Sequence, residues 1–293
     1  MSSSKLSAQA IALLISLTLI WGTSFILIKQ GLKVFDADEL AALRVTAACL
    51  FLLPFALTSL KGLERKDHIT LLISGLTGIF IPAFLFAYAQ THLDSSVAGI
   101  LNTLSPLWMM VIGSLFFNQH FSGNAIFGTL LGFVGAILLM TIGSGTSLFD
   151  FNSYSLLIVI AAAFYGTNLN WVKFRVRAIP SLTITSVSLL LIGPLAASYL
   201  FGVSDFTYKL NHSEGAWKAF GFVVLLGCMG TSVATILFNK LIKISTPLFA
   251  SSVTYVLPIV AVMWGVLDGE QLLIGHFVGM AAILCGVYLA NRK

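Results

Sequence analysis

The stretch WGTSFILIK, Trp21 to Lys29, is matched 144 residues later by YGTNLNWVK, Tyr165 to Lys173. A second pair occurs in the same order, because AGILNTLSPLW at 98–108 is matched by ASSVTYVLPIV at 250–260, a spacing of 152 residues. Ordered matches of this kind indicate an internal repeat. The chain therefore consists of two similar halves, and this division decides the fold.

The composition of the chain excludes a water-soluble enzyme. Of the 293 residues, 58% are hydrophobic and 9% are charged, whereas roughly 25% of the residues in a typical soluble domain are charged. The 16 Lys and Arg and the 11 Asp and Glu residues cannot form the polar shell that a soluble fold of this length needs. Lipid must therefore cover much of the surface.

Ten apolar runs are long enough to cross a bilayer as helices, which takes about 20 residues each. The runs are 9–29, 38–58, 69–90, 96–117, 123–142, 153–172, 181–202, 217–239, 246–267 and 272–290. Five fall in each half, which we place at residues 1–147 and 148–293. Because five is odd, the second half must enter the membrane upside down. The sequence predicts an all-α integral membrane fold of two inverted five-helix repeats, an architecture found in many transporters.

The positive charges predict the orientation of these crossings. With the N-terminus in the cytoplasm, the cytoplasmic segments carry 11 Lys and Arg residues and the opposite segments carry 4. This positive-inside bias places both termini in the cytoplasm of a multi-pass protein of the inner (cell) membrane. It also accounts for the net charge of +5 without a nucleic-acid partner.

Polar residues recur on one side of several crossings at helical spacing, for example Asn102 and Ser105, or Tyr165 and Asn168. Polar groups inside a membrane face a cavity or a partner helix. The candidate substrate-binding residues are Trp21, Tyr88, Asn102, Ser105, Tyr165, Asn168, Thr235, Asn239 and Tyr255. The alternative for any one of them is a hydrogen bond that only holds two helices together. For the set, we favour a pathway lined by both repeats.

Two prolines, Pro106 and Pro258, occupy matching positions in the two halves. Proline removes one backbone hydrogen bond and kinks a helix. Paired interruptions of this kind point to a transporter's substrate site. Packing alone is the other explanation.

Arg44 lies inside the second predicted crossing. We expect its guanidinium to extend to the headgroups or to Asp36, Asp38 or Glu39, with attraction of an anion as the alternative. All eleven carboxylates lie in loops or at helix ends, so none is expected at the midplane to carry a proton. The predicted cavity therefore has no fixed charge at its centre.

Small residues line the fifth and tenth crossings. They are Gly128, Gly132, Gly135, Gly275, Gly279, Ala282 and Gly286. Small residues let helix backbones approach closely. We expect these faces to pack within one protomer, and a homodimer through the same faces is the rival interpretation.

No motif in the chain predicts catalysis, a metal site or a cofactor. The sequence contains no GxSxG or HExxH motif and no carboxylate pair within a crossing. The histidines lie near the ends of the crossings without metal-ligand spacing, and the three cysteines lie in apolar runs. We therefore expect neither an intramembrane enzyme nor a scaffold, which would need long loops.

The chain resembles the drug/metabolite transporter superfamily, in particular its EamA-type ten-helix metabolite exporters. The opening stretch WGTSFILIKQGLKVFDADELAALR, residues 21–44, is similar to the family's first two helices. The stretch VTYVLPIVAVMWGVLDGEQLLIGHFVGMAAILCGVYL, residues 253–289, is similar to the end of its second repeat. The acid that the family places after each fourth helix is present as Glu270 but is Asn118 in the first half.

The residues and the resemblance lead to one functional expectation. An aromatic and amide-rich lining suits neutral or zwitterionic solutes, whose ammonium can meet a ring and whose carboxylate can accept hydrogen bonds. The resemblance implies export of amino acids or related metabolites by alternating access. The alternative is a carrier for a drug, a nucleotide-sugar-like solute or a quaternary amine. The expected partners are a small-molecule substrate and the lipid bilayer.

Overall fold

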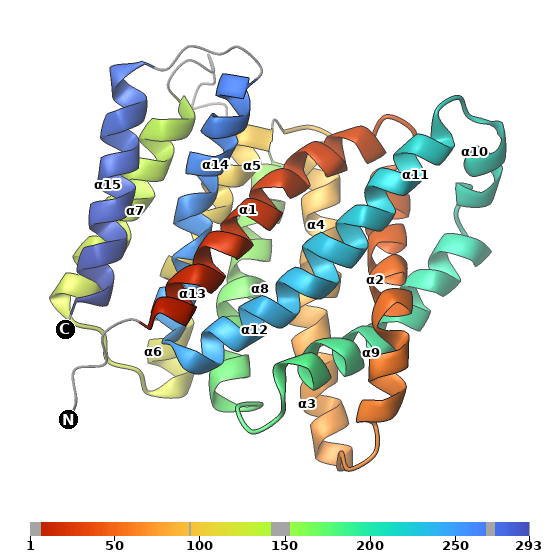
Figure 1. Ribbon diagram of the computed structural model, residues 1–293, viewed down its shortest axis with the longest axis horizontal. Helices are drawn as coiled ribbons and strands as arrows, with labels where there is room; N and C mark the ends of the chain where they lie inside the picture. The colour runs from red at the N-terminus through yellow and green to blue at the C-terminus, as the bar shows by residue number, and fades with distance from the viewer. Residues whose placement is uncertain (1–6, 94, 142–152, 268–272, 293) are drawn as a thin grey trace.

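The computed structural model describes residues 7–93, 95–141, 153–267 and 273–292, and within these ranges the chain is almost entirely helical without a strand (Figure 1). The first half contains α1 (Ala8–Gly31), α2 (Ala37–Ser59), α3 (Arg65–Gly75), η1 (Leu76–Phe80), α4 (Ile81–Gln90), α5 (Ser95–Asn102), α6 (Ser105–Phe117) and α7 (Gly123–Thr141). The second half contains α8 (Ser155–Phe174), α9 (Ser181–Gly202), α10 (Phe206–His212), α11 (Ala216–Leu225), η2 (Leu226–Val233), α12 (Ala234–Ile244), α13 (Pro247–Ser251), α14 (Val253–Leu267) and α15 (Ile274–Asn291). Glu270, Lys5 and Lys293 lie outside the described residues.

The apolar helical segments confirm the predicted fold class. Over the residues that the structure describes, seven segments are individually long and apolar enough to cross a bilayer, and three shorter apolar segments supply the fourth, fifth and ninth crossings. Continuous helix joins α3, η1 and α4 into the third crossing, and α11, η2 and α12 into the eighth. In Figure 1, α1 begins and α8 ends toward the lower side, so these equivalent crossings run in opposite directions.

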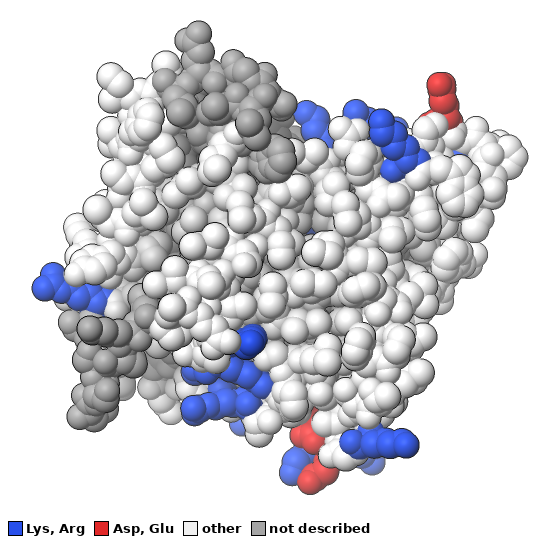
Figure 2. Space-filling view, in the orientation of Figure 1, with Lys and Arg blue, Asp and Glu red and all other residues white. Residues whose placement is uncertain are grey.

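The outer surface of the molecule is suited to lipid. Figure 2 shows the Lys, Arg, Asp and Glu side chains of the visible face gathered at two opposite rims, with an uncharged band between them. Large apolar side chains are exposed on the surface, including Leu115, Phe116 and Phe277, which are 70%, 73% and 56% exposed. In water these side chains would destabilise the fold, whereas in a bilayer they meet acyl chains.

Contacts between the crossings repeat across the two halves. The helix α1 packs against η2, α12 and α14, and the equivalent helix α8 packs against η1, α4 and α6. The helix α2 packs against its own equivalent α9, and α7 packs against α15. This pattern is that of an approximate two-fold axis between the halves, as expected for inverted repeats.

Two equivalent glycines, one in each half, make the same kind of close contact with a neighbouring helix. A Cβ atom on Gly22 of α1 would lie 2.6 Å from a methyl group of Val260 on α14. A Cβ atom on Gly166 of α8 would lie 2.6 Å from the backbone nitrogen of Met109 and 2.8 Å from the carbonyl carbon of Trp108 on α6. Only glycine permits these helix contacts, which explains the Trp-Gly and Tyr-Gly pairs of the repeated stretch.

The small-residue faces of α7 and α15 pack against each other within the protomer. A Cβ atom on Gly128 would meet the backbone of Ala290 at 2.3 Å, and one on Gly286 would meet the backbone of Gly132 at 2.5 Å. The structure thus has the packing within one protomer that we expect from the sequence. A homodimer stays a prediction, and it would have to use other surfaces.

The fourth and ninth crossings are both interrupted before their prolines, and the kink predicted at Pro258 stays a prediction. The fourth crossing breaks at Thr103 and Leu104, so Pro106 occupies the first turn of α6, where its missing N–H is not needed. The ninth crossing breaks at Ser252, six residues before Pro258, which lies inside α14. The expected kink at Pro106 is therefore a helix break, and the two breaks do not fall at matching positions.

Each half also contains a π-helical segment, η1 in the third crossing and η2 in the eighth. The two segments lie at equivalent positions, because the 152-residue spacing carries Leu76–Phe80 to positions within Leu226–Val233. A π turn inserts an extra residue and is common at functional sites. Both segments face the centre of the molecule, where the cavity lies.

Candidate functional site

A cavity of about 130 Å³ lies between the two halves. It is similar in size to the roughly 150 Å³ cavity that holds one benzene molecule. Residues from α1, α2, η1, α4, α5, α6, α8, η2, α12, α13 and α14 line it. The site is therefore built by both halves at their interface, which is where transporters built from inverted repeats hold their solutes.

Most of the lining consists of residues at equivalent positions of the two repeats. With spacings of 144 residues for the α1–α8 positions and 152 residues for the others, eight pairs of lining residues correspond. The pairs are Trp21 with Tyr165, Ser24 with Asn168, Gly78 with Gly230, Ile79 with Thr231, Ala83 with Thr235, Phe86 with Phe238, Asn102 with Thr254, and Ser105 with Leu257. The approximate two-fold axis therefore passes through the cavity.

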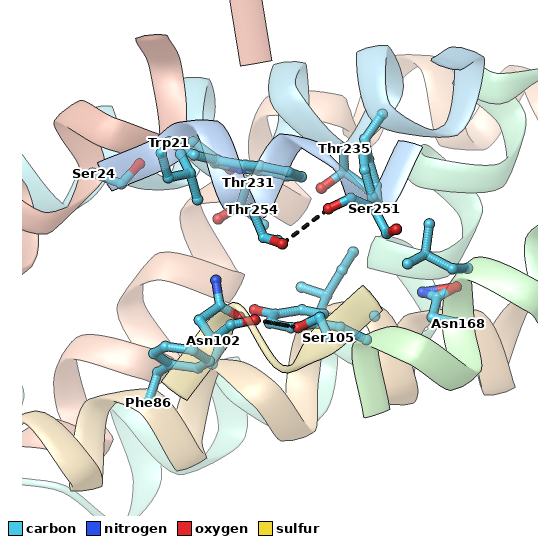
Figure 3. A pocket seen from close by; sticks show the side chains of 18 of the residues that line it. Trp21, Ser24, Phe86, Asn102, Ser105, Asn168, Thr231, Thr235, Ser251 and Thr254 are labelled. Atoms are coloured by element: carbon cyan, nitrogen blue, oxygen red, sulfur yellow. Dashed lines mark hydrogen bonds between the residues drawn. The ribbon is translucent and has the colours of Figure 1, made fainter. Parts of the chain in front are cut away.

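Figure 3 shows two facing walls of this cavity. Trp21, Thr231 and Thr254 lie on one wall, and Phe86, Asn102 and Ser105 lie on the other. The first wall comes from α1, η2 and α14, and the second comes from α4, α5 and α6. A solute in the cavity would thus contact both halves at once.

Trp21 is fixed in place by two contacts with the eighth crossing. Its indole N–H donates to the carbonyl of Gly230, with 2.8 Å between the nitrogen and the oxygen. Its ring meets the ring of Phe238 edge to face, with 5.0 Å between the ring centres. Because the indole N–H already has a partner, the exposed part of Trp21 that lines the cavity is its aromatic ring.

Two lining amides also bridge helices. The amide nitrogen of Asn168 donates to the carbonyl of Ser74, and the hydroxyl of Ser74 donates back to the Asn168 side-chain oxygen, both at 3.2 Å. The amide nitrogen of Asn239 donates to the hydroxyl of Thr185 at 3.0 Å. Both amides therefore make hydrogen bonds that hold two helices together, which is the alternative interpretation from the sequence. Both residues also line the cavity.

Hydroxyl groups satisfy backbone carbonyls beside the helix breaks. Ser105 donates to the carbonyl of Asn102 at 2.7 Å, and Thr254 donates to the carbonyl of Ser251 at 2.9 Å (Figure 3). An unpaired carbonyl inside a membrane costs free energy. These two backbone carbonyls beside the helix breaks therefore have hydrogen-bond donors.

Arg44 lines the cavity, contrary to the expected extension toward headgroups or acids. Its Nε donates to the hydroxyl of Thr231 at 2.6 Å. Among the described residues, no carboxylate lies within 4 Å of its guanidinium. The expectation of a cavity without a fixed charge is therefore wrong.

The acids expected near Arg44 are bound elsewhere. The ammonium of Lys209, on α10, lies 2.8 Å from Glu39 and also pairs with Asp36. The carboxylate of Asp38 accepts a hydrogen bond from the Tyr199 hydroxyl. Desolvation lowers the pKa of Lys209, but the hydrogen bonds to Asp36 and Glu39 outweigh it and hold that pKa above its ordinary value. Lys209, and not Arg44, is therefore the cation that pairs with Asp36 and Glu39.

Seven of the nine predicted binding residues line the cavity, and two lie outside it. The seven are Trp21, Asn102, Ser105, Tyr165, Asn168, Thr235 and Asn239. Tyr88 is 47% exposed on α4. Tyr255 is buried against Gly132 of α7, where the absence of a side chain leaves room for its ring.

Two of the lining residues that the sequence pattern missed are Phe86 and Thr231. In the third crossing Ile79, Ala83 and Phe86 line the cavity at ordinary helical spacing, whereas Tyr88 lies outside it. In the eighth crossing Thr231 lines the cavity four residues before Thr235, and the neighbouring Ser232 instead donates to the carbonyl of Ala48. The periodicity alone therefore does not decide which face of each crossing meets the cavity.

Comparison with known proteins identifies what this architecture is similar to. A sequence model of the EamA-like transporter family matches residues 8–141 and 152–292. An uncharacterized transporter of Archaeoglobus fulgidus is 24% identical over 277 residues, which cover 93% of this chain and 95% of that protein. The uncharacterized inner membrane transporter YedA of Escherichia coli K12 is 24% identical over 289 residues, or 95% of this chain and 89% of that protein.

Two further matches concern half of the sequence and the fold. The uncharacterized transporter YdfC of Bacillus subtilis is 27% identical over 146 residues, and that match covers 50% of this chain and 47% of YdfC. A crystal structure of a protein with 19% sequence identity shares the fold, with a TM-score of 0.71 over 96% of each chain.

Proposed function

Because the chain belongs to the EamA-like transporter family and is a membrane transporter, we propose that it carries small zwitterionic metabolites, such as amino acids, by alternating access. The observation that carries this proposal is the cavity whose lining corresponds pairwise between the two halves. When two inverted repeats surround one site, rocking of one repeat against the other exposes the site first to one side and then to the other.

The chemistry of the lining supports a zwitterionic solute. Aromatic rings from Trp21, Phe86 and Tyr165 can face an ammonium group. Hydroxyl and amide groups from Asn102 and Thr235 can bond to a carboxylate. The volume of about 130 Å³ favours a solute of few heavy atoms.

The charge distribution supports a cytoplasmic location of both termini. The positive-inside bias of 11 against 4 Lys and Arg residues is the basis of this orientation. Export is the direction that the family resemblance implies. A membrane-impermeant amine reagent applied to intact cells tests this orientation. We expect that Lys5 does not react, because it lies in the cytoplasm.

Counterflow in proteoliposomes tests the proposed activity. Purified full-length protein is reconstituted, the vesicles are loaded with an unlabelled amino acid, and uptake of the labelled amino acid is followed for L-alanine, L-serine, L-leucine and L-phenylalanine. We expect saturable, transient accumulation of at least one of them. Flux that rises linearly with concentration would indicate a channel, and no flux of any amino acid would contradict the assigned solute class.

Matched variants connect this activity to the cavity. Tyr165→Ala and Asn102→Ala should each lower uptake at limiting solute by at least about tenfold, which corresponds to roughly 1.4 kcal/mol of lost binding. Tyr288→Ala removes a tyrosine that is 64% exposed on α15 and should leave uptake unchanged. Unchanged uptake in both cavity variants would contradict the site, provided that the variants remain folded.

A further inference from the structure

We propose that Arg44 binds a carboxylate of the transported solute and thereby makes a negative charge a requirement for recognition. This inference rests on the proposed transport function and names the feature that the solute must have. Among the described residues that line the cavity, Arg44 is the one with a formal charge. Its guanidinium belongs to α2, which packs against both the eighth crossing and α9 at the centre of the molecule.

The cation is without a counter-ion in the described part of the protein. Glu39 and Asp36 pair with Lys209, and Asp38 is bonded to Tyr199. A charge in a membrane interior is costly unless it is paired or faces water. A carboxylate brought in by a solute would supply the missing partner.

The positive charge is not needed to pack the repeat. The position equivalent to Arg44 in the second half is Ser188, because a Cβ atom on Gly227 would lie 2.7 Å from the Arg44 carbonyl and one on Gly75 would lie 3.0 Å from the Ser188 carbonyl. The same backbone contact thus forms with a serine, whose hydroxyl donates to the carbonyl of Leu71 at 2.7 Å. Arg44 therefore has a role that this contact does not explain.

The local geometry prepares Arg44 to receive an anion. The bond from its Nε to Thr231 at 2.6 Å holds one edge of the guanidinium. The terminal amino groups have no hydrogen bond to any described residue. A guanidinium presents parallel N–H donors that match the two oxygens of a carboxylate. The other described lining residues are neutral, so none of them competes with Arg44 for the anion.

The test compares solutes that retain or lack the carboxylate or the ammonium group. L-Alanine, L-leucine and L-phenylalanine are each compared with the corresponding amide, with the decarboxylated amine and with the carboxylic acid that lacks the amino group. Thermal shift measures binding to the detergent-purified full-length protein, and counterflow measures transport. We expect amides and amines to bind at least about 30-fold more weakly than the amino acids, as for loss of a partner from a buried charge pair.

Variants assign that preference to Arg44. In Arg44→Gln the preference for the acid over its amide should disappear, and Arg44→Lys should retain part of it because the charge remains without the planar donor pair. Thr231→Val removes the bond that holds the guanidinium and should weaken acid binding more than amide binding. Arg65→Gln removes an equal charge from an exposed position at the start of α3 and should change nothing.

The outcomes separate this inference from the proposed function. Equal binding of acid and amide by the wild type, or a preference that survives in Arg44→Gln, would overturn the role of Arg44 while transport stands. If simple carboxylic acids bind in an Arg44-dependent way and amino acids do not, the role of Arg44 stands and the zwitterionic solute class fails. If Arg44→Gln does not fold, the comparison of acid with amide in the wild type still decides.

Discussion

Gly22 and Gly166 determine how closely each repeat approaches the other at the cavity. Each follows an aromatic residue that lines the cavity, Trp21 or Tyr165. The glycine lets its helix touch the ninth or the fourth crossing, and the aromatic residue before it lines the cavity. The repeated Trp-Gly and Tyr-Gly pairs therefore combine close helix packing with a wall of the site.

The substitution Gly22→Ala tests this reading of the motif. The added Cβ would meet Val260 at 2.6 Å, so we expect a loss of about 1 to 3 kcal/mol in stability, as for other overpacked sites. Gly166→Ala should be at least as harmful because its Cβ would meet backbone atoms of α6. Thermal unfolding in detergent measures both effects.

The control is Gly221→Ala in α11, where the added Cβ would meet no described atom within 4 Å apart from its chain neighbours and its own helix backbone. Alanine favours helix over glycine by about 1 kcal/mol, so this variant should be neutral or slightly more stable. Equal unfolding temperatures for all three variants would mean that the close helix contacts do not limit stability.

At the level of the elements, the sequence predicts the crossings well and their irregularities poorly. Apolar length alone places the seventh crossing at 181–202, which α9 matches. The π segments and helix breaks are not predictable in this way, because they depend on contacts with other crossings, such as the bond from Trp21 to the carbonyl of Gly230. Which face of the regular helix α4 meets the cavity also depends on these contacts, and the structure has Phe86 in the lining and Tyr88 outside it.

Arg44 shows the corresponding limit for the site. The acids Asp36 and Glu39 are close to it in sequence, so a local ion pair is the natural prediction. The cation that pairs with these acids is instead Lys209, on the short helix α10, about 170 residues later. A single sequence cannot reveal that this helix reaches the start of α2 and that its lysine pairs with these acids.

The link between α10 and α2 has a predictable pH dependence. The ordinary lysine pKa is about 10.4, and that of Lys209 is raised, so its pairing stabilises the fold fully below pH 10.4 and is lost as the pH rises through the raised pKa. Lys209→Gln should destabilise by about 1 to 3 kcal/mol, because Glu39 is nearly buried and Asp36 is exposed.

Thermal unfolding of both proteins from pH 6 to 11 checks this expectation. The difference between wild type and Lys209→Gln should be constant from pH 6 to 9 and should shrink only above about pH 10.4. Lys218→Gln, which removes an exposed lysine nearby in sequence, is the matched control. A difference that already vanishes near pH 8 would contradict the assigned pairing.

At the scale of the whole molecule, the two ends of the structure differ although the repeats correspond. Lys173, at the end of α8, donates to the carbonyl of Ile242 at 2.9 Å and to that of Ser245, and so ties α8 to the end of α12. Lys29, its equivalent at the end of α1, has no hydrogen bond or ion pair to any described residue. One conformation of an alternating cycle is expected to have this asymmetry.

Cysteine accessibility tests most directly whether the cavity opens alternately to both sides. Cys49, Cys228 and Cys285 are replaced, and single cysteines are introduced as Asn102→Cys and Thr254→Cys, at equivalent positions on the two walls. Leu284→Cys, on the outer face of α15 where Leu284 is 57% exposed, serves as the lipid-facing control. A membrane-impermeant maleimide is then applied to vesicles of each orientation. We predict that both cavity cysteines react from both sides and the control from neither; cavity cysteines that react from one side only, or from neither, would contradict alternating access through this site.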